Sequence, residues 1–175
     1  MKKSVKQIIW QIPMLLGLIG IDQWVKEWIY HNLKGQEPIV WIKGVFELTY
    51  VENRGAAFGM LSGWSWLFYV LTPLSLVLIA YLLYKVSREK KYRIAQLCCL
   101  LIMAGAIGNF IDRAVRGFVV DMFYFKLINF AVFNVADSYI VVGMILLAGM
   151  ILFNKEFSAV IFSEKKEEHN HDGTV

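Results

Sequence analysis

The sequence predicts an α-helical integral membrane protein with four transmembrane helices and a small extracytoplasmic β-hairpin in the first outer loop. The chain of 175 residues is 58% hydrophobic and has a mean hydropathy of +0.53, which is too apolar for a soluble domain of this size. Residues 64–84 and 94–111 contain no charged side chain. At about 1.5 Å per helical residue, each run nearly spans the ~30 Å hydrocarbon core of a bilayer.

The four spans are expected at about residues 8–28, 64–84, 94–111 and 133–153. Three lysines precede the first apolar run, as in a signal peptide, but no small-residue cleavage site follows, so we expect a retained span. In the second span, Pro73 predicts a kink. We expect residues 1–162 to form a single membrane domain and the polar residues 163–175 to form a disordered cytoplasmic tail.

Two long loops separate the spans, at about residues 31–63 and 112–134. In the first loop, two β-type segments around Lys43-Gly44 predict a hairpin, which could lie on the membrane face and hold an extended peptide. The second loop is aromatic with few charges, and we interpret it as an interfacial segment.

The distribution of Lys and Arg predicts the orientation of the chain in the membrane. These residues are more numerous in the N terminus, the 85–93 link and the tail than in the two long loops. The positive-inside rule therefore places both termini in the cytoplasm and both long loops outside. The basic residues form no stripe interleaved with stacking groups, so nucleic acid is not an expected partner.

Asp121 and Asp137 are carboxylates beside long apolar runs, where an ionisable group is costly and indicates function. Two carboxylates that share a proton can activate water against an amide. Alternatively, Asn134 could cap the fourth helix, with Asp137 completing a capping box. The apolar run 139–153 is too short to cross a bilayer by itself, so the span must include residues 133–138. Asp137 then lies at the membrane boundary.

Other polar residues near the outer ends of the spans allow two interpretations each. Asp22 and Lys26 share a helix face, either as an interfacial ion pair with a snorkelling lysine or as a bracket for a lipid headgroup or the outer loop. Asn53 and Gly55 form either an ordinary surface turn or a site where the amide fixes substrate backbone or a lipid carbonyl.

Asn109, Asp112 and Arg113 fall on one face at the end of the third span. They could be a capped helix end with an interfacial arginine, but a buried asparagine needs hydrogen-bond partners, which favours a functional cluster. Two of the three histidines lie in the tail, and neither a nucleophile–histidine arrangement nor metal-ligand spacing is present in the sequence. We therefore expect no metal and no cofactor.

Five ordered motifs, taken together, resemble the lipoprotein signal peptidases (signal peptidase II), a family of bacterial four-span membrane aspartic proteases. The similarity covers about residues 19–153. The motifs are Asp22…Lys26, Asn53-Arg54-Gly55-Ala56-Ala57-Phe58, Gly108-Asn109-Phe110-Ile111-Asp112-Arg113, Val120-Asp121 and Phe133-Asn134-Val135-Ala136-Asp137-Ser138. Ala104 and Met122 differ conservatively from residues frequent in the family.

The resemblance implies an aspartic endopeptidase in the bacterial cytoplasmic membrane, with its active site near the extracytoplasmic face. The implied substrate is a prolipoprotein signal peptide, cut just before a cysteine that carries a diacylglyceryl group. We expect a monomer in contact with membrane lipid. The implied catalytic pair is Asp121 and Asp137, without an assignment of the shared proton. The implied supporting residues are Asp22, Lys26, Asn53, Gly55, Asn109, Asp112, Arg113 and Asn134.

Two other classes of function are compatible with these residues. A small proton-coupled transporter or channel component could use the same acids as a relay, but the midplane of the four expected spans lacks ionisable groups. A membrane assembly factor without enzymatic activity is the third possibility. Cleavage of a lipidated precursor by purified protein would separate the first interpretation from the other two.

Overall fold

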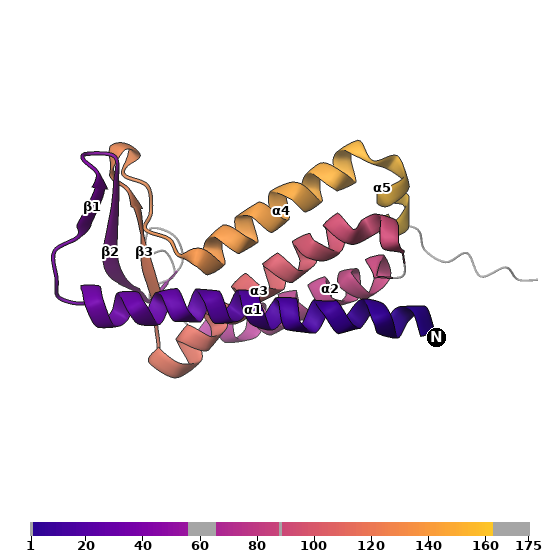
Figure 1. Cartoon of the computed structure of the whole chain (residues 1–175), viewed down its shortest axis with the longest axis horizontal. Helices are drawn as coiled ribbons and strands as arrows, with labels where there is room; N and C mark the ends of the chain where they lie inside the picture. The colour runs from indigo at the N-terminus through magenta and orange to yellow at the C-terminus, as the bar shows by residue number, and fades with distance from the viewer. Residues whose placement is uncertain (1, 56–65, 88, 163–175) are drawn as a thin grey trace, which may run out of the picture.

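The computed structural model describes residues 2–55, 66–87 and 89–162, and this part of the chain is mostly helical. Long helices run side by side, with a small sheet at one end and the N terminus and a short helix at the other (Figure 1). The elements in chain order are α1 (Lys2–Leu33), β1 (Ile39–Ile42), β2 (Phe46–Asn53), α2 (Trp66–Val86), a 3₁₀ turn η2 (Lys90–Tyr92), α3 (Arg93–Arg116), β3 (Val119–Phe125), a 3₁₀ turn η3 (Lys126–Ile128), α4 (Val135–Phe153) and α5 (Lys155–Phe162).

Three helices of the described residues are long and apolar enough to cross a membrane: α2, α4, and α3 together with the turn that precedes it. They correspond to the predicted second, fourth and third spans. The exposed surface of α2 is almost entirely apolar, as expected for a helix that faces lipid. Helix α1 contains the predicted first span, and that it too crosses the membrane stays a proposal. The helix continues beyond the predicted end at residue 28 to Leu33, and Gly35, with a φ of 73°, follows it.

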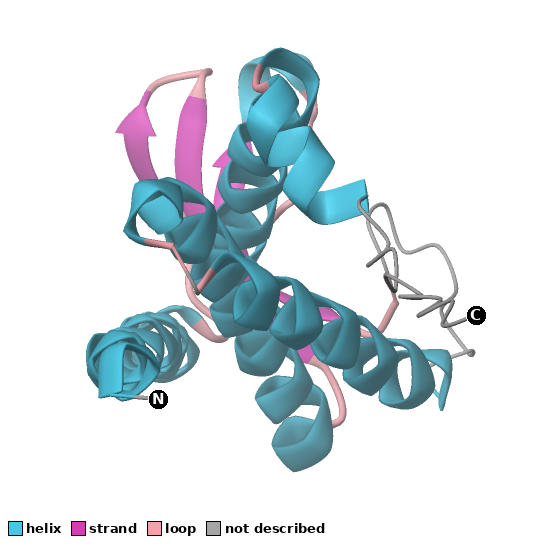
Figure 2. Ribbon diagram, turned by 90° about the vertical axis from the view of Figure 1, so that its right-hand side faces the viewer, coloured by secondary structure: helices cyan, strands magenta, loops and turns pink. Residues whose placement is uncertain are grey.

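Helix α3 is the centre of the bundle, because α1, α2 and α4 all pack against it. Figure 2 views the helices from the end that carries α5, with the strands behind them. Glycines allow α3 and α4 to approach closely. A Cβ atom on Gly105 would overlap the carbonyl oxygen of Ala136 and lie 2.7 Å from Ile140, and one on Gly143 would lie 2.8 Å from Ile102.

The sheet is antiparallel, with strand order β1-β2-β3. The predicted hairpin is confirmed as β1 and β2, and Gly44 in the turn has a φ of 74°. No strand was predicted in the second loop, whose position at the membrane interface stays a prediction. Residues 119–125 form β3, because the backbone pairs with β2 and Val119, Val120 and Met122 are buried. The same loop was predicted to begin at Asp112, but α3 continues to Arg116 and ends at Gly117, whose φ is 76°.

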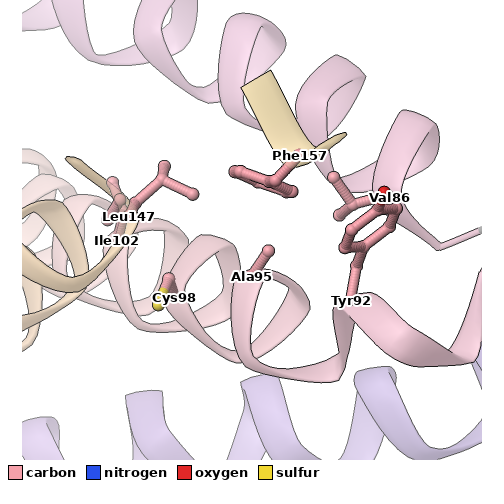
Figure 3. Close-up of a cluster of buried hydrophobic side chains, with 7 residues drawn as sticks. All are labelled: Val86, Tyr92, Ala95, Cys98, Ile102, Leu147 and Phe157. Carbon is pink, nitrogen blue, oxygen red and sulfur yellow. The ribbon is translucent and has the colours of Figure 1, made fainter. Parts of the chain in front are cut away.

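A hydrophobic cluster at the end opposite the sheet fixes α2, α3, α4 and α5 together (Figure 3). Phe157 of α5 is fully buried and contacts Tyr92 at a ring-centroid distance of 5.2 Å, with the two rings tilted by 59°. Helix α5 was not predicted. Cys98 and Cys99 are buried free thiols. The predicted tail 163–175, the start of the second span at 64–65, and Ala56, Ala57 and Phe58 of the second motif lie outside the described residues.

Candidate active site

Asp121 and Asp137 come from different elements and line one cavity of about 580 Å³. Asp121 lies in the middle of β3, opposite Val51 of β2, and is 1% exposed. Asp137 lies in the first turn of α4 and is partly buried. The polar lining also includes Asn53, Gly55, Asn109, Arg113 and Ser138, whereas the other walls are apolar. The cavity has the size of a pocket for a short peptide or small ligand.

Asn134 connects the two aspartates directly. Its side-chain Nδ2 donates a hydrogen bond to Asp121 Oδ1 at 2.6 Å. Its Oδ1 accepts from the backbone N–H of Asp137 at 2.9 Å, and its own backbone N–H donates to Asp137 Oδ2 at 3.1 Å. The capping box considered from the sequence is therefore present. Asn134 can both cap α4 and belong to the site, because capping uses its side-chain oxygen and leaves its side-chain nitrogen to bond Asp121.

Two further amides complete the hydrogen bonding of the carboxylates. Asn53 Nδ2 donates to Asp121 Oδ2 at 2.8 Å, and Asn109 Nδ2 donates to Asp137 Oδ1 at 2.7 Å. Each aspartate thus accepts an N–H bond on both oxygens. Asn53 is held in turn by Gly55, whose backbone N–H donates to Asn53 Oδ1 at 2.9 Å. The surface-turn interpretation of Asn53 is therefore incomplete, because the turn aims its amide at Asp121.

Burial, together with the nearby charge of Asp137, raises the pKa of Asp121 from its ordinary value of 3.8 to about 7. The amide bonds from Asn53 and Asn134 act in the opposite direction but are outweighed by desolvation. A pKa near 7 lets Asp121 carry a proton near neutral pH, so that its carboxyl group can donate a hydrogen bond as well as accept one.

Arg113 holds the turn of residues 53–55 against α3. Its guanidinium donates to the carbonyl oxygen of Gly55 at 3.1 Å and to that of Asn109 at 3.3 Å. It also lies over the ring of Phe68, 4.1 Å from the centroid, which ties α2 to the same place. The guanidinium therefore brings a positive charge to the wall of a cavity that contains two carboxylates.

Asp22, Lys26 and Asp112 form a second cluster behind the cavity, which we call the carboxylate–lysine cluster. Lys26 Nζ lies 3.0 Å from Asp22 Oδ2 and 3.2 Å from Asp112 Oδ2, and all three side chains are 0% exposed. The snorkelling interpretation of Lys26 is wrong, because the ammonium group points into the protein. It donates to Asn109 Oδ1 at 2.8 Å, so the cluster contacts the residue that contacts Asp137.

Several contributors to the site were not predicted. Arg116 donates to Asp112 Oδ1 at 3.0 Å and to Glu27, and its position four residues after Asp112 was the available indication. Gln23 donates to the carbonyl oxygen of Gly108 at 3.1 Å, and no sequence pattern indicates it. Ser138 lines the cavity, where its hydroxyl donates to the carbonyl oxygen of Asn134 at 3.0 Å.

Comparison with known sequences identifies a family for this arrangement. A family model described as signal peptidase (SPase) II matches residues 14–153. A lipoprotein signal peptidase of Streptococcus thermophilus is 49% identical over 146 residues, which cover 83% of this chain and 94% of the relative. A lipoprotein signal peptidase of Clostridioides difficile is 44% identical over 142 residues, which cover 81% and 94% of the two chains.

Solved structures agree with the sequence comparison. One bacterial membrane enzyme has a TM-score of 0.71 and 28% sequence identity, with coverage of 91% of this chain and 94% of that chain. Another has a TM-score of 0.71 and 31% identity, with coverage of 84% and 95%. With a family model that matches most of the chain and relatives above 40% identity, this chain belongs to the signal peptidase II family.

Proposed function

We propose that this chain is a membrane aspartic endopeptidase that removes signal peptides from prolipoproteins, with Asp121 and Asp137 as the catalytic pair. Membership of the signal peptidase II family supports the reaction and the class of substrate. The observation that carries the catalytic assignment is the shared cavity, in which Asn134 donates a hydrogen bond to the carboxylate of each aspartate. The cut is proposed to fall just before a cysteine that carries a diacylglyceryl group.

The environments of the two aspartates support different roles. Asp121, with a pKa raised to about 7, would hold the proton and donate a hydrogen bond to the scissile carbonyl. Asp137 lies at the N terminus of α4, where the helix dipole favours a negative charge, and would act as the base towards water. No covalent acyl intermediate is needed, and the scheme uses neither metal nor cofactor, which stays a prediction.

The walls of the cavity support a lipid-anchored peptide as substrate. Phe130, Val141 and Val142 form an apolar side of the cavity, and the exposed face of α4 beyond it is also apolar. A peptide near the bilayer surface could place its cut site between the aspartates while the diacyl chains stay in hydrocarbon. Lipid burial at about 0.8 kcal/mol per CH₂ would then contribute to positioning. Membrane lipid and the precursor are thus the proposed partners of a monomeric enzyme.

We also propose four spans, with both termini in the cytoplasm and the sheet end of the molecule outside. Under this proposal, residues 1–162 are one membrane domain and 163–175 a cytoplasmic tail. Cysteine placed at exposed Gln36 should react with an impermeant thiol reagent in intact bacteria, and cysteine at exposed Lys90 should not. The background is a variant with both native cysteines replaced by alanine. The opposite labelling pattern would place the aspartates in the cytoplasm.

The test of the enzymatic proposal is cleavage of a lipidated precursor by protein purified in detergent. A peptidase should release the signal peptide in the absence of other proteins and of any ion gradient. A proton-coupled transporter would need sealed vesicles, and an assembly factor would show no turnover. Failure of well-folded protein to cut the precursor would exclude the proposed function.

A further inference from the structure

The carboxylate–lysine cluster accepts hydrogen bonds from two backbone N–H groups, and each belongs to the residue directly before one of the two aspartates. Asp22 Oδ1 accepts a hydrogen bond from the backbone N–H of Ala136 at 2.9 Å, and Ala136 immediately precedes Asp137. Asp112 Oδ2 accepts from the backbone N–H of Val120 at 3.1 Å, and Val120 immediately precedes Asp121. One carboxylate of the cluster thus fixes the chain beside each catalytic aspartate.

Lys26 joins these two contacts and adds a third. Its ammonium group has three donors, and the three acceptors at hydrogen-bond distance are Asp22, Asp112 and Asn109 Oδ1. An ammonium can only donate, so it determines which end of the Asn109 amide faces it. The other end, Nδ2, must then point away, and it donates to Asp137 Oδ1 at 2.7 Å.

Close contacts and hydrogen bonds restrict the side chains of this cluster. A Cβ atom on Gly108 would overlap the carboxylate of Asp22 and lie 3.1 Å from its Cγ, so α3 can pass only because residue 108 is glycine. Arg116 takes the remaining oxygen of Asp112. Asp112 accordingly accepts bonds on both oxygens and cannot rotate without losing at least one of them.

The energetics argue against a role in stability alone. Removing charges from water costs several kcal/mol per ion, and well-packed apolar residues in place of a buried ion pair are often equally stable or more so. Lys26, Asp22 and Asp112 are all 0% exposed, and none of them lines the cavity. Their geometry serves the two backbone contacts and the amide of Asn109, all of which lead to the aspartates.

We propose that Asp22, Lys26 and Asp112 are positioning residues that set the relative placement of the two catalytic aspartates. Asp22 holds the backbone before Asp137, Asp112 holds the backbone before Asp121, and Lys26 locks the two carboxylates and the Asn109 amide into one unit. This inference rests on the proposed function, since it assumes that Asp121 and Asp137 act together on the substrate.

The test separates kcat from KM. Lys26→Met removes the ammonium but keeps most of the side-chain length. Because a misplacement of about 1 Å can cost about 100-fold in rate, we expect kcat to fall by about 100-fold. KM should stay within about twofold of wild type, because the cavity walls that receive the peptide are untouched. The matched control is Gln11→Met, which also removes a buried polar link from α1 to α3. Neither Gln11 nor its partners Ser87 and Gln96 line the cavity, so this variant should leave kcat unchanged.

Lys26→Met leaves two buried carboxylates facing each other, so folding must be tested separately. The triple variant Asp22→Asn/Lys26→Met/Asp112→Asn carries no charge in the cluster, and its amide oxygens can still accept from Ala136 and Val120. We expect it to unfold cooperatively on heating in detergent and to keep the low kcat. A folded triple variant with kcat within threefold of wild type would overturn the inference, and so would a rise in KM that accounts for the loss.

A triple variant that does not fold would also overturn the inference, because the cluster would then be needed for the fold itself. Asp121→Asn and Asp137→Asn, assayed in parallel, distinguish this failure from failure of the proposed function. If those two variants are inactive while the folded triple variant is active, only the positioning role is lost. If the two variants cleave the precursor normally, the catalytic assignment is wrong.

Discussion

The two ends of the helix bundle join the same helices by different chemistry. Near the sheet, α1 contacts α3 through the charged carboxylate–lysine cluster. Near the N terminus, α1 contacts α3 through neutral groups, which we call the glutamine cluster: Gln11 Nε2 donates to Ser87 Oγ at 2.9 Å and to Gln96 Oε1 at 3.3 Å. Gln96 Nε2 in turn donates to the carbonyl oxygen of Val86 at 3.0 Å. Both clusters are buried.

This difference between a neutral and a charged cluster separates the contacts that hold helices together from those that position the two aspartates. Neutral amides are sufficient to hold two helices together inside an apolar protein, as the glutamine cluster demonstrates. Breaking a buried ion pair costs about 3–5 kcal/mol, against about 1–3 kcal/mol for an unsatisfied neutral group. Among the described residues, a fully buried ion pair lies at the sheet end, where the proposed mechanism requires two carboxylates to be held at a defined separation.

The largest effect is expected from substitution of the two aspartates at the sheet end, which tests whether peptide cleavage depends on them. Asp121→Asn and Asp137→Asn keep the side-chain size but remove the ionisable group. Each should lower kcat by at least about 1000-fold, which corresponds to about 4 kcal/mol of activation free energy. The measurement is cleavage of a lipidated precursor by purified, folded variants. The double variant should be little worse than either single one, because residues that act as a unit are non-additive. A single variant with a tenth of wild-type activity would refute the assignment.

The second prediction concerns the anchor of the substrate. A precursor with an unmodified cysteine lacks the diacyl chains that would fix the depth of its cut site. We expect it to be cut at least about 100-fold more slowly than the lipidated precursor, a difference of about 2.7 kcal/mol. Both precursors are compared at one detergent concentration. Equal rates would show that the peptide alone carries specificity, and would contradict a lipid-dependent peptidase.

The third prediction concerns the pH dependence of kcat/KM, which should depend on Asp121 at the sheet end and not on the glutamine cluster at the other end of the bundle. The raised pKa of Asp121 means that its proton stays bound up to about pH 7 and is lost above it. If this proton is donated to the scissile carbonyl, kcat/KM should fall about tenfold per pH unit above that value. The glutamine cluster has no titratable group, so Gln11→Met should not move the profile. Activity that instead rises through pH 7 would make Asp121 the base and reverse the proposed roles.

The fourth prediction concerns the contribution of the glutamine cluster to the free energy of unfolding. Gln11→Met removes the donor to Ser87 and Gln96, and should lower the free energy of unfolding by about 1–3 kcal/mol. Thermal unfolding in detergent checks the stability, and the cleavage assay should show wild-type kcat. A loss of activity without a loss of stability would mean that the two ends are coupled.

Removal of metal ions is expected to have no effect on cleavage. The proposed mechanism needs no metal at either end, so cleavage should continue unchanged after dialysis against EDTA. An activity that disappears on chelation and returns with added zinc would contradict the proposal that two aspartates activate the water.

Much of the fold could be predicted from the sequence because the bilayer dictates length and polarity. The uncharged runs locate α2, α3 and α4 within a few residues, and Lys43-Gly44 locates the hairpin. The third strand was missed because 119–125 is apolar at nearly every position, a pattern that strands and interfacial segments share. Helix α5 is a short segment held by Phe157, and such tertiary packing is not visible in local sequence.

For the site, the sequence identified residues but not their connections. Asp121, Asp137 and their three asparagines come together in the structure, although whether each acts in catalysis stays a prediction. The burial of Lys26 could not be anticipated, because an isolated lysine near a helix end reaches water cheaply. Its direction depends on Asp112, which lies more than eighty residues away in the chain.

Asn134 links the formation of the first turn of α4 to the pairing of the two aspartates. The same side chain caps the N terminus of α4 and donates a hydrogen bond to Asp121. A chain synthesised from its N terminus has Asp121 before α4 exists, so an unfinished protein holds one acid without its partner. Under the proposed mechanism, proteolytic capacity would arise only when the last long helix has been inserted. The membrane would thus be protected from a peptidase that is still being made.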